Sequence, residues 1–208
     1  MEINTFKTEY NVKNKNVYEF FKRIFDIIIS IIGLIIGLPF LIVFGVAIKL
    51  EDMGPIFYKQ ERLSKNNKIF FVYKLRSMKI DAEKNGIQQW AQKNDTRITK
   101  TGRFIRKTRI DEIPQFLNIL KGDMSLIGPR PERPELTYKF NEEIPRFMDR
   151  LLVKPGLTGL AQVNGGYDIS PEEKLKWDLN YIENRSLLMD IKIILKTIIV
   201  VFTGEGAR

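Results

Sequence analysis

A run of 22 residues without a charged side chain, at positions 27–48, constrains this chain more than any other feature. As one α-helix the run would measure roughly 33 Å, enough to cross the hydrocarbon core of a bilayer. It lies too far from the N-terminus, and is too long, for a typical signal peptide. We therefore predict three parts: a polar N-terminal arm at 1–19, a membrane helix at 20–49 and the main domain at 50–208.

Two features of the membrane segment argue against a straight spanning helix. Pro39 cannot donate a backbone hydrogen bond to the carbonyl of Ile35, so the helix should kink or break there. Residues 7–26 hold five Lys or Arg, and residues 49–68 also hold five, whereas a single span normally keeps its positive flank inside. Equal flanks fit a re-entrant helix–break–helix with both ends on the cytoplasmic face. A proline-kinked spanning helix is the equally weighted alternative, since membrane helices tolerate proline.

The charge and the missing residue types narrow the chemistry. A net charge of +9 favours an anionic partner: nucleic acid, membrane lipid or a phosphorylated substrate. The chain has no Cys and no His, so thiol nucleophiles, thiolate metal sites and the commonest general base are excluded. Covalent chemistry must fall to Asp, Glu, Ser, Thr, Lys or Tyr. Any metal must be a hard one such as Mg²⁺, with Mn²⁺ as the alternative.

The remaining pattern predicts an α+β fold that is mainly helical. Strands at 55–60 and 69–73, separated by a turn at 64–68, predict a small β-hairpin. Helices are expected at 111–120, 135–149 and 171–184, the last with Ser170 as N-cap, and 157–166 is expected to be a loop. The segment 187–202 is apolar but interrupted by three charges, which favours an amphipathic helix lying in the membrane interface.

Asp111 and Glu112 form the first candidate site, with Arg106 and Arg109 just before them. At the start of a helix both carboxylates can reach a common metal or phosphate, and the arginines can hold an anionic substrate beside them. Helix capping is the commoner explanation for acids at such a position. On the pattern alone, capping is therefore favoured over a site.

Three further motifs and one basic run carry polar groups. Residues 127–134 present Arg130 and Arg133 on a loop stiffened by prolines, as phosphate binding or a rigid surface loop would require. Residues 154–164 offer Lys154, Gln162 and Asn164 between glycines, and residues 73–78 offer Lys74 and Arg76. A turn between core elements is the structural alternative for the first of these two motifs, and a polar strand end for the second. The basic run 97–109 contains one aromatic residue, so contact with anionic lipid headgroups is favoured over nucleic acid.

Four motifs occur in order: KRIFD (22–26), YKLRSM (73–78), RIDEIPQFLNILKGDMSLIGPRP (109–131) and KPGLTGLAQVNG (154–165). Together they closely resemble the bacterial sugar transferase family, the monotopic polyprenyl-phosphate phosphoglycosyl transferases, in its compact form. The similarity covers roughly residues 18–204. It implies a membrane enzyme that moves a hexose 1-phosphate from a UDP-sugar to polyprenyl (undecaprenyl) phosphate and releases UMP.

The resemblance also assigns roles to residues. Asp111 would be the nucleophile that carries a covalent sugar phosphate. Glu112 would hold Mg²⁺ with Asp111 or assist the second attack, and Asp178 would be a further active-site acid. Lys74, Arg106 and Arg130 match positions thought to hold phosphates. Arg76, Lys154, Gln162 and Asn164 complete the predicted substrate-binding set, while Asp26 and Pro39 match the membrane segment, with Pro39 as its break.

The implied setting is the bacterial inner (cytoplasmic) membrane, with the catalytic domain, 50–208, facing the cytoplasm. The reaction would be the first membrane step of exopolysaccharide, capsule or glycoconjugate synthesis. The expected partners are the two substrates and anionic lipids, not nucleic acid, and the oligomeric state is open, with a homo-oligomer among the options. The motif at 128–135 resembles members acting on glucose or galactose more than those acting on di-N-acetylated sugars.

The sequence differs from the family pattern at one place, and two other functions are alternatives to this prediction. Many relatives have an Arg after the Asn-Gly that corresponds to Asn164-Gly165, where this chain has Gly166-Tyr167. A membrane scaffold that binds anionic lipid would explain the charge and the apolar segments, but not the Asp-Glu and GPRP motifs. A membrane-tethered nucleic-acid binder would explain the charge alone.

Overall fold

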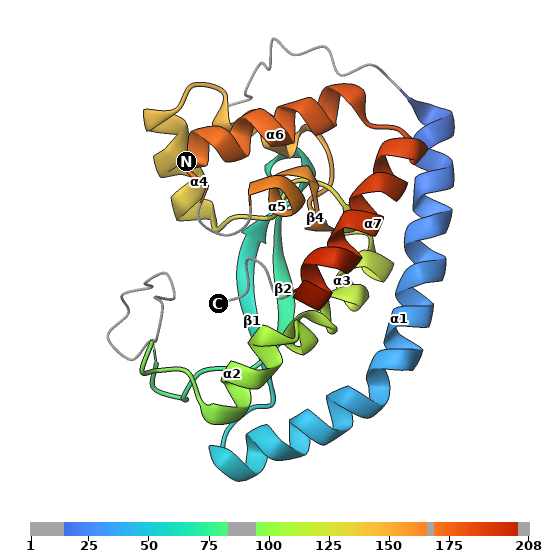
Figure 1. Cartoon of the computed structure of the whole chain (residues 1–208). Coiled ribbons are helices and arrows are strands. Elements are labelled where there is room, and N and C mark those ends of the chain that lie inside the picture. The colour runs from blue at the N-terminus through green and yellow to red at the C-terminus, as the bar shows by residue number, and fades with distance from the viewer. Residues whose placement is uncertain (1–14, 83–94, 166–168, 204–208) are drawn as a thin grey trace.

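The computed structural model of the chain describes residues 15–82, 95–165 and 169–203. The predicted N-terminal arm, apart from its last residues, and the Gly166-Tyr167 departure lie outside the described residues. One long helix, α1 (Asn16–Glu51), runs along one side of a domain built from shorter helices and two small sheets (Figure 1). The predicted α+β, mainly helical fold is confirmed.

Helix α1 continues through Pro39 without interruption. It is the one helix among the described residues that is long and apolar enough to cross a membrane. Figure 1 shows that it changes direction along its length, so the predicted break is a bend in a single helix. Loss of one backbone donor costs only a local hydrogen bond, and the domain supports α1 near the proline. A Cβ added at Gly37 would lie 2.6 Å from Ile113 Cγ2.

The polarity of α1 is inverted relative to a helix of a soluble protein. Its buried face carries polar and small residues, namely Lys22, Asp26, Ser30, Gly37 and Gly45, with Ile48 at the end. Its exposed residues are large and apolar, among them Phe20, Ile28, Ile35, Ile36, Ile42 and Val43. Exposed apolar surface of this extent is expected to meet lipid or a partner rather than water.

Buried polar contacts fasten the first half of α1 to the domain. Asp26 accepts hydrogen bonds from Ser125 Oγ at 3.1 Å and from the backbone of Leu126 at 3.0 Å. Lys22 pairs with Asp190 at 3.1 Å. Asp190 also accepts hydrogen bonds from the Tyr18 and Tyr181 hydroxyls, each at 2.9 Å. Each buried charge therefore has hydrogen-bonding partners, as burial of ions requires.

The hairpin consists of β1 (Phe57–Leu63) and β2 (Ile69–Leu75), antiparallel and joined through the 3₁₀ turn η1 (Lys65–Asn67). This prediction is confirmed. The second sheet pairs β3 (Ser125–Ile127) with β4 (Gly156–Thr158) in parallel. The helical elements are α2 (Lys100–Lys107), η2 (Ile110–Glu112), α3 (Gln115–Lys121), α4 (Pro134–Glu143), η3 (Phe147–Leu152), α5 (Leu160–Gly165), α6 (Pro171–Asn184) and α7 (Leu187–Thr203).

Helix α6 has the predicted bounds, and Ser170 Oγ accepts a hydrogen bond from the backbone of Glu173, the predicted cap. Three other predictions were wrong in part. The expected helix 111–120 divides into η2 and α3 around Pro114, and 135–149 divides into α4 and η3. The expected loop 157–166 contains most of β4 and all of α5, because Gly156 and Gly159 let the chain lie against Gly128, where a Cβ on either would overlap the Gly128 backbone.

The predicted C-terminal helix is present as α7. Ile193 on this helix is buried with Ile119, Met124, Ile127 and Ile182, in a core that joins α3, β3, α6 and α7. The rest of α7 exposes a row of large apolar side chains: Leu187, Leu188, Ile191, Leu195, Ile198 and Ile199. The row gives α7 an apolar exposed face like that of α1.

Candidate active site

The Asp-Glu pair lies on the short turn η2, between α2 and α3. Arg109, just before it, has a left-handed backbone (φ 60°), which is uncommon for a residue other than glycine. This conformation ends α2 and redirects the chain into η2. Pro114 then precedes α3, so the two acids lie on a separate 3₁₀ turn and do not begin the predicted helix 111–120. Asp111 is buried, and the side chain of Glu112 is 12% exposed.

Glu112 is held by two cations from distant parts of the sequence. Its Oε1 atom accepts from Lys74 Nζ at 3.1 Å and from Arg130 Nη2 at 2.6 Å. Lys74 comes from β2, and Arg130 from the loop after β3. Burial alone would raise the pKa of Glu112, but Arg130 and then Lys74 outweigh it and hold this pKa well below its ordinary range. Three of the motifs singled out in the sequence therefore meet at one carboxylate.

Asp111 differs from Glu112 in the contacts of its carboxylate. No hydrogen bond or ion pair to its carboxylate occurs within the described ranges. Burial raises the pKa of Asp111 to about 6; Lys74 opposes the shift, Glu112 adds to it, and Arg106 and Arg109 oppose it. At neutral pH the group is therefore mostly ionised. A buried carboxylate that accepts no hydrogen bond from the described residues, near Lys74, Arg106 and Arg109, can present its oxygens for reaction.

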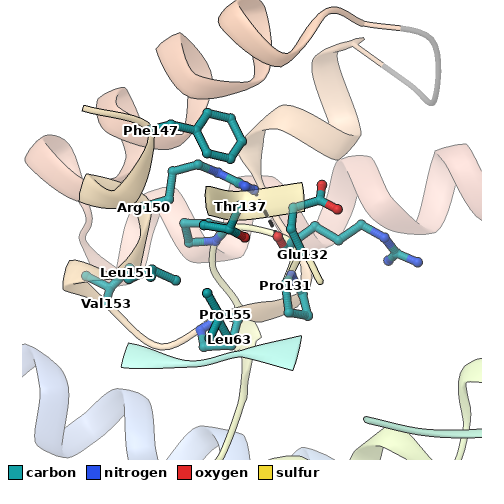
Figure 2. A pocket seen from close by; sticks show the side chains of 11 residues that line it. Leu63, Pro131, Glu132, Thr137, Phe147, Arg150, Leu151, Val153 and Pro155 are labelled. Carbon is teal, nitrogen blue, oxygen red and sulfur yellow. Dashed lines mark hydrogen bonds between the residues drawn. The ribbon is translucent and has the colours of Figure 1, made fainter. Parts of the chain in front are cut away.

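Asp178, predicted as a further active-site acid, lies behind the site. It is 1% exposed and accepts from Arg150 Nε at 2.6 Å. Arg150 in turn donates to the backbone carbonyl of Arg130 at 2.9 Å. Arg150 lines a small hollow together with Phe147 and with Arg130 and Glu132 of the loop (Figure 2). Asp178 thus contacts the site through another residue.

The other predicted substrate-binding residues have their contacts elsewhere. Arg76 is buried against Asp52, to whose carboxylate its Nη1 lies at 3.4 Å, and ties β2 to the end of α1. Lys154 lies beside Gly122 and Arg23 at the C-terminal end of α3, where cations are favourable. Gln162 donates to the Leu157 carbonyl at 3.0 Å, and Asn164 accepts from Lys196 at 2.8 Å.

Sequence reasoning missed Arg150. It lies at the end of the segment predicted as helix 135–149, outside every motif, and no local spacing marks it. A buried basic residue with an acid 28 positions away is visible only once the chain has folded.

The fold places a long apolar helix of membrane-spanning type beside a buried pair of acids with basic neighbours. Residues 17–204 match the family described as bacterial sugar transferase. The match covers most of the chain, and the chain belongs to this family.

Relatives with curated names support the same family. A UDP-N-acetylgalactosamine-undecaprenyl-phosphate N-acetylgalactosaminephosphotransferase from Aeromonas hydrophila is 46% identical over 195 residues, covering 92% of this chain and 46% of the relative. A UDP-glucose:undecaprenyl-phosphate glucose-1-phosphate transferase from Xanthomonas campestris pv. campestris is 37% identical over 201 residues, 94% of this chain and 42% of the relative. The exopolysaccharide production protein PSS of Rhizobium leguminosarum bv. phaseoli is 40% identical over 195 residues, covering 89% of this chain and 97% of the relative. The chain spans less than half the length of the first two.

Proposed function

We propose that this chain transfers a hexose 1-phosphate from a UDP-sugar to undecaprenyl phosphate and releases UMP. One observation supports this most: the buried carboxylate of Asp111 lies next to a glutamate that Lys74 and Arg130 hold at 3.1 and 2.6 Å. Phosphoryl transfer needs charge neutralisation and positioning more than a strong base. The site supplies both without Cys or His.

The proposed reaction has two steps at one phosphorus atom. An oxygen of Asp111 attacks the phosphorus that carries the sugar, and the bond from that phosphorus to the UMP oxygen breaks. The products are UMP and a sugar phosphate esterified to Asp111. A phosphate oxygen of undecaprenyl phosphate then attacks the same phosphorus, the bond to Asp111 breaks, and the carboxylate is restored. Arg106 and Arg109 supply positive charge beside Asp111 in both steps.

A divalent cation fits this site only in part. Within the described residues no three carboxylates come together, and one oxygen of Glu112 is engaged by Lys74 and Arg130. The second oxygen of Glu112 and the carboxylate of Asp111 would hold Mg²⁺, which commonly uses one or two carboxylates plus substrate phosphates. When bound, the ion would neutralise diphosphate charge.

The test of this function is release of UMP by the purified protein from a UDP-sugar, undecaprenyl phosphate and Mg²⁺. We expect turnover that stops when EDTA is added and returns with excess Mg²⁺. Binding of anionic vesicles that weakens with salt, without UMP release from any UDP-sugar, would instead support the membrane scaffold. Turnover that persists in EDTA would refute the metal requirement alone.

The same assay, run with UDP-sugars that differ at one carbon atom, tests which sugar the chain transfers. UDP-galactose and UDP-N-acetylgalactosamine differ only at C2, and UDP-glucose differs from UDP-galactose only at C4. The motif at 128–135 favours glucose or galactose, whereas the Aeromonas relative carries an N-acetylgalactosamine name. Turnover of UDP-N-acetylgalactosamine alone would overturn the hexose prediction.

We also propose that α1 is re-entrant, with both ends on the cytoplasmic side. The packing of the domain supports this. Ile113, which directly follows Glu112, packs on Gly37 in the middle of the apolar run. A spanning α1 would therefore carry the charged dyad toward the centre of the bilayer, where charged groups are costly. A helix that enters and returns keeps the dyad near the interface, where a soluble and a lipid-borne substrate can meet.

Single cysteines at the two ends of α1 test the topology, and the chain has no native cysteine to interfere. We expect Asn16→Cys and Lys59→Cys, both at exposed positions, to react with an impermeant maleimide only in inside-out vesicles. Permeabilised cells provide the control that each thiol can react. Labelling of the two positions from opposite sides would establish a spanning helix.

A further inference from the structure

Arg150 is a buried arginine that belongs to none of the motifs. It is 4% exposed, and three groups fix its guanidinium. Nε donates to Asp178 at 2.6 Å, Nη2 donates to the Arg130 carbonyl at 2.9 Å, and the guanidinium carbon lies 4.8 Å from the centre of the Phe147 ring. Figure 2 shows Arg150 and Phe147 side by side. An arginine this completely engaged is held in one orientation.

The β3–β4 sheet holds the residues before Arg130, and the Glu132 carbonyl beyond it accepts from the Leu63 backbone at 3.2 Å, so the Arg130 carbonyl lies between two anchored points. Gly128 donates to the Thr158 carbonyl at 3.0 Å, and the Pro129 carbonyl accepts from Gly156 at 2.9 Å. Beyond Pro129 the sheet ends. The next carbonyl, that of Arg130, is the one that Arg150 binds.

A continuous chain of contacts therefore leads from α6 to the dyad. Asp178 binds Arg150, Arg150 binds the backbone of Arg130, and the Arg130 side chain binds Glu112 at 2.6 Å. The guanidinium reaches Asp178 and the Arg130 carbonyl through different nitrogens at once. A lysine at position 150 could still neutralise Asp178, but its single ammonium could not reproduce both directed bonds.

We propose that Arg150, held by Asp178, is a positioning residue that sets Arg130 against Glu112. The inference rests on the proposed function for its effect on rate. It also revises the role predicted for Asp178, which acts through Arg150 rather than on the substrate. Positioning errors of about 1 Å can cost roughly a hundredfold in rate, so a loosened Arg130 loop should slow transfer without removing a reacting group.

A double-mutant cycle tests the proposal. Arg150→Lys is made in the native chain and in an Arg130→Ala background, and the single-turnover rate of UMP release is measured in each. We expect a loss of roughly tenfold or more in the native chain and less than about twofold where Arg130 is already absent. Arg146→Lys is the matched control on the same turn. Its side chain pairs with Asp149 at 2.8 Å, and it should be silent in both backgrounds.

Hydrogen–deuterium exchange of residues 128–133 gives a readout independent of activity. Arg150→Lys should speed exchange there, and Arg146→Lys should not. If Arg150→Lys fails to fold, Asp178→Asn takes its place in the same cycle and exchange measurement. Equal rate losses in both backgrounds, or unchanged exchange, would overturn the positioning role. If Arg150→Lys alters exchange but the native protein itself releases no UMP, the proposed function has failed and the positioning contact stands.

Discussion

Replacement of Asp111 by Asn should lower kcat/KM for sugar-phosphate transfer by at least about 10³-fold, the scale seen when a nucleophile is removed. The amide keeps the shape of the side chain and loses its charge. Because Asp111 has no hydrogen bond or ion pair among the described residues, no native contact is broken. The fold should therefore persist, and thermal unfolding should change little, since the relief of burying a charge offsets the lost attraction to Lys74, Arg106 and Arg109.

The measurement is the rate of UMP release by purified Asp111→Asn protein at UDP-sugar concentrations well below KM, with undecaprenyl phosphate and Mg²⁺ present. Glu61→Gln is the control, because this exposed residue of β1 changes charge in the same way away from the dyad, and its activity should stay within about twofold of native. Glu112→Gln should also be severely impaired, since the charge that Lys74 and Arg130 hold is lost. More than a tenth of native activity in Asp111→Asn would exclude Asp111 as the nucleophile.

Of the substitutions proposed for this chain, Asp190→Ala should lower the free energy of unfolding most. Its carboxylate pairs with Lys22 and accepts from Tyr18 and Tyr181. Truncation leaves a buried ammonium without a counter-ion and two hydroxyls with fewer partners. Breaking a buried pair from one side costs about 3–5 kcal/mol, which lowers Tm by roughly 10 °C in a chain of this size. The consequence should be loosened docking of the first half of α1.

Thermal unfolding in nanodiscs, followed by tryptophan fluorescence, measures this effect. Glu183→Ala, at an exposed position near the end of α6, is the control and should shift Tm little. The double variant Lys22→Met with Asp190→Leu should recover much of the loss, because an apolar pair can replace a buried ion pair. A Tm within about 2 °C of native for Asp190→Ala would show that the pair contributes little.

Local signals in the sequence were sufficient for the elements whose boundaries are local. Ser170, Pro171 and Glu173 marked the start of α6, and the turn at 64–68 marked the hairpin, because caps and turns depend on neighbouring residues. The motifs also singled out Lys74, Glu112 and Arg130, which the fold brings together. The division around Pro114 was missed because the acids and the apolar residues after it share one helical pattern.

Ion pairs between residues far apart in the sequence could not be predicted from local sequence patterns. Lys22 and Asp190 are 168 positions apart, and Arg150 and Asp178 are 28 apart. Neither spacing relates to a helix or strand period. The contacts of Arg76, Lys154, Gln162 and Asn164 were equally invisible to the pattern, and their role in substrate binding stays a prediction.

Mass spectrometry of the protein incubated with UDP-sugar and Mg²⁺, without undecaprenyl phosphate, tests the central claim most directly. Trypsin cleaves after Arg109 and Lys121, so one peptide, 110–121, contains both acids of the dyad. We expect an adduct of sugar-phosphate mass on this peptide, which fragmentation places on Asp111 and which Asp111→Asn abolishes. Addition of undecaprenyl phosphate should discharge it. UMP formed only when both substrates are present, with no adduct trapped, would contradict the account and favour direct transfer in a ternary complex, with Asp111 serving as a metal ligand.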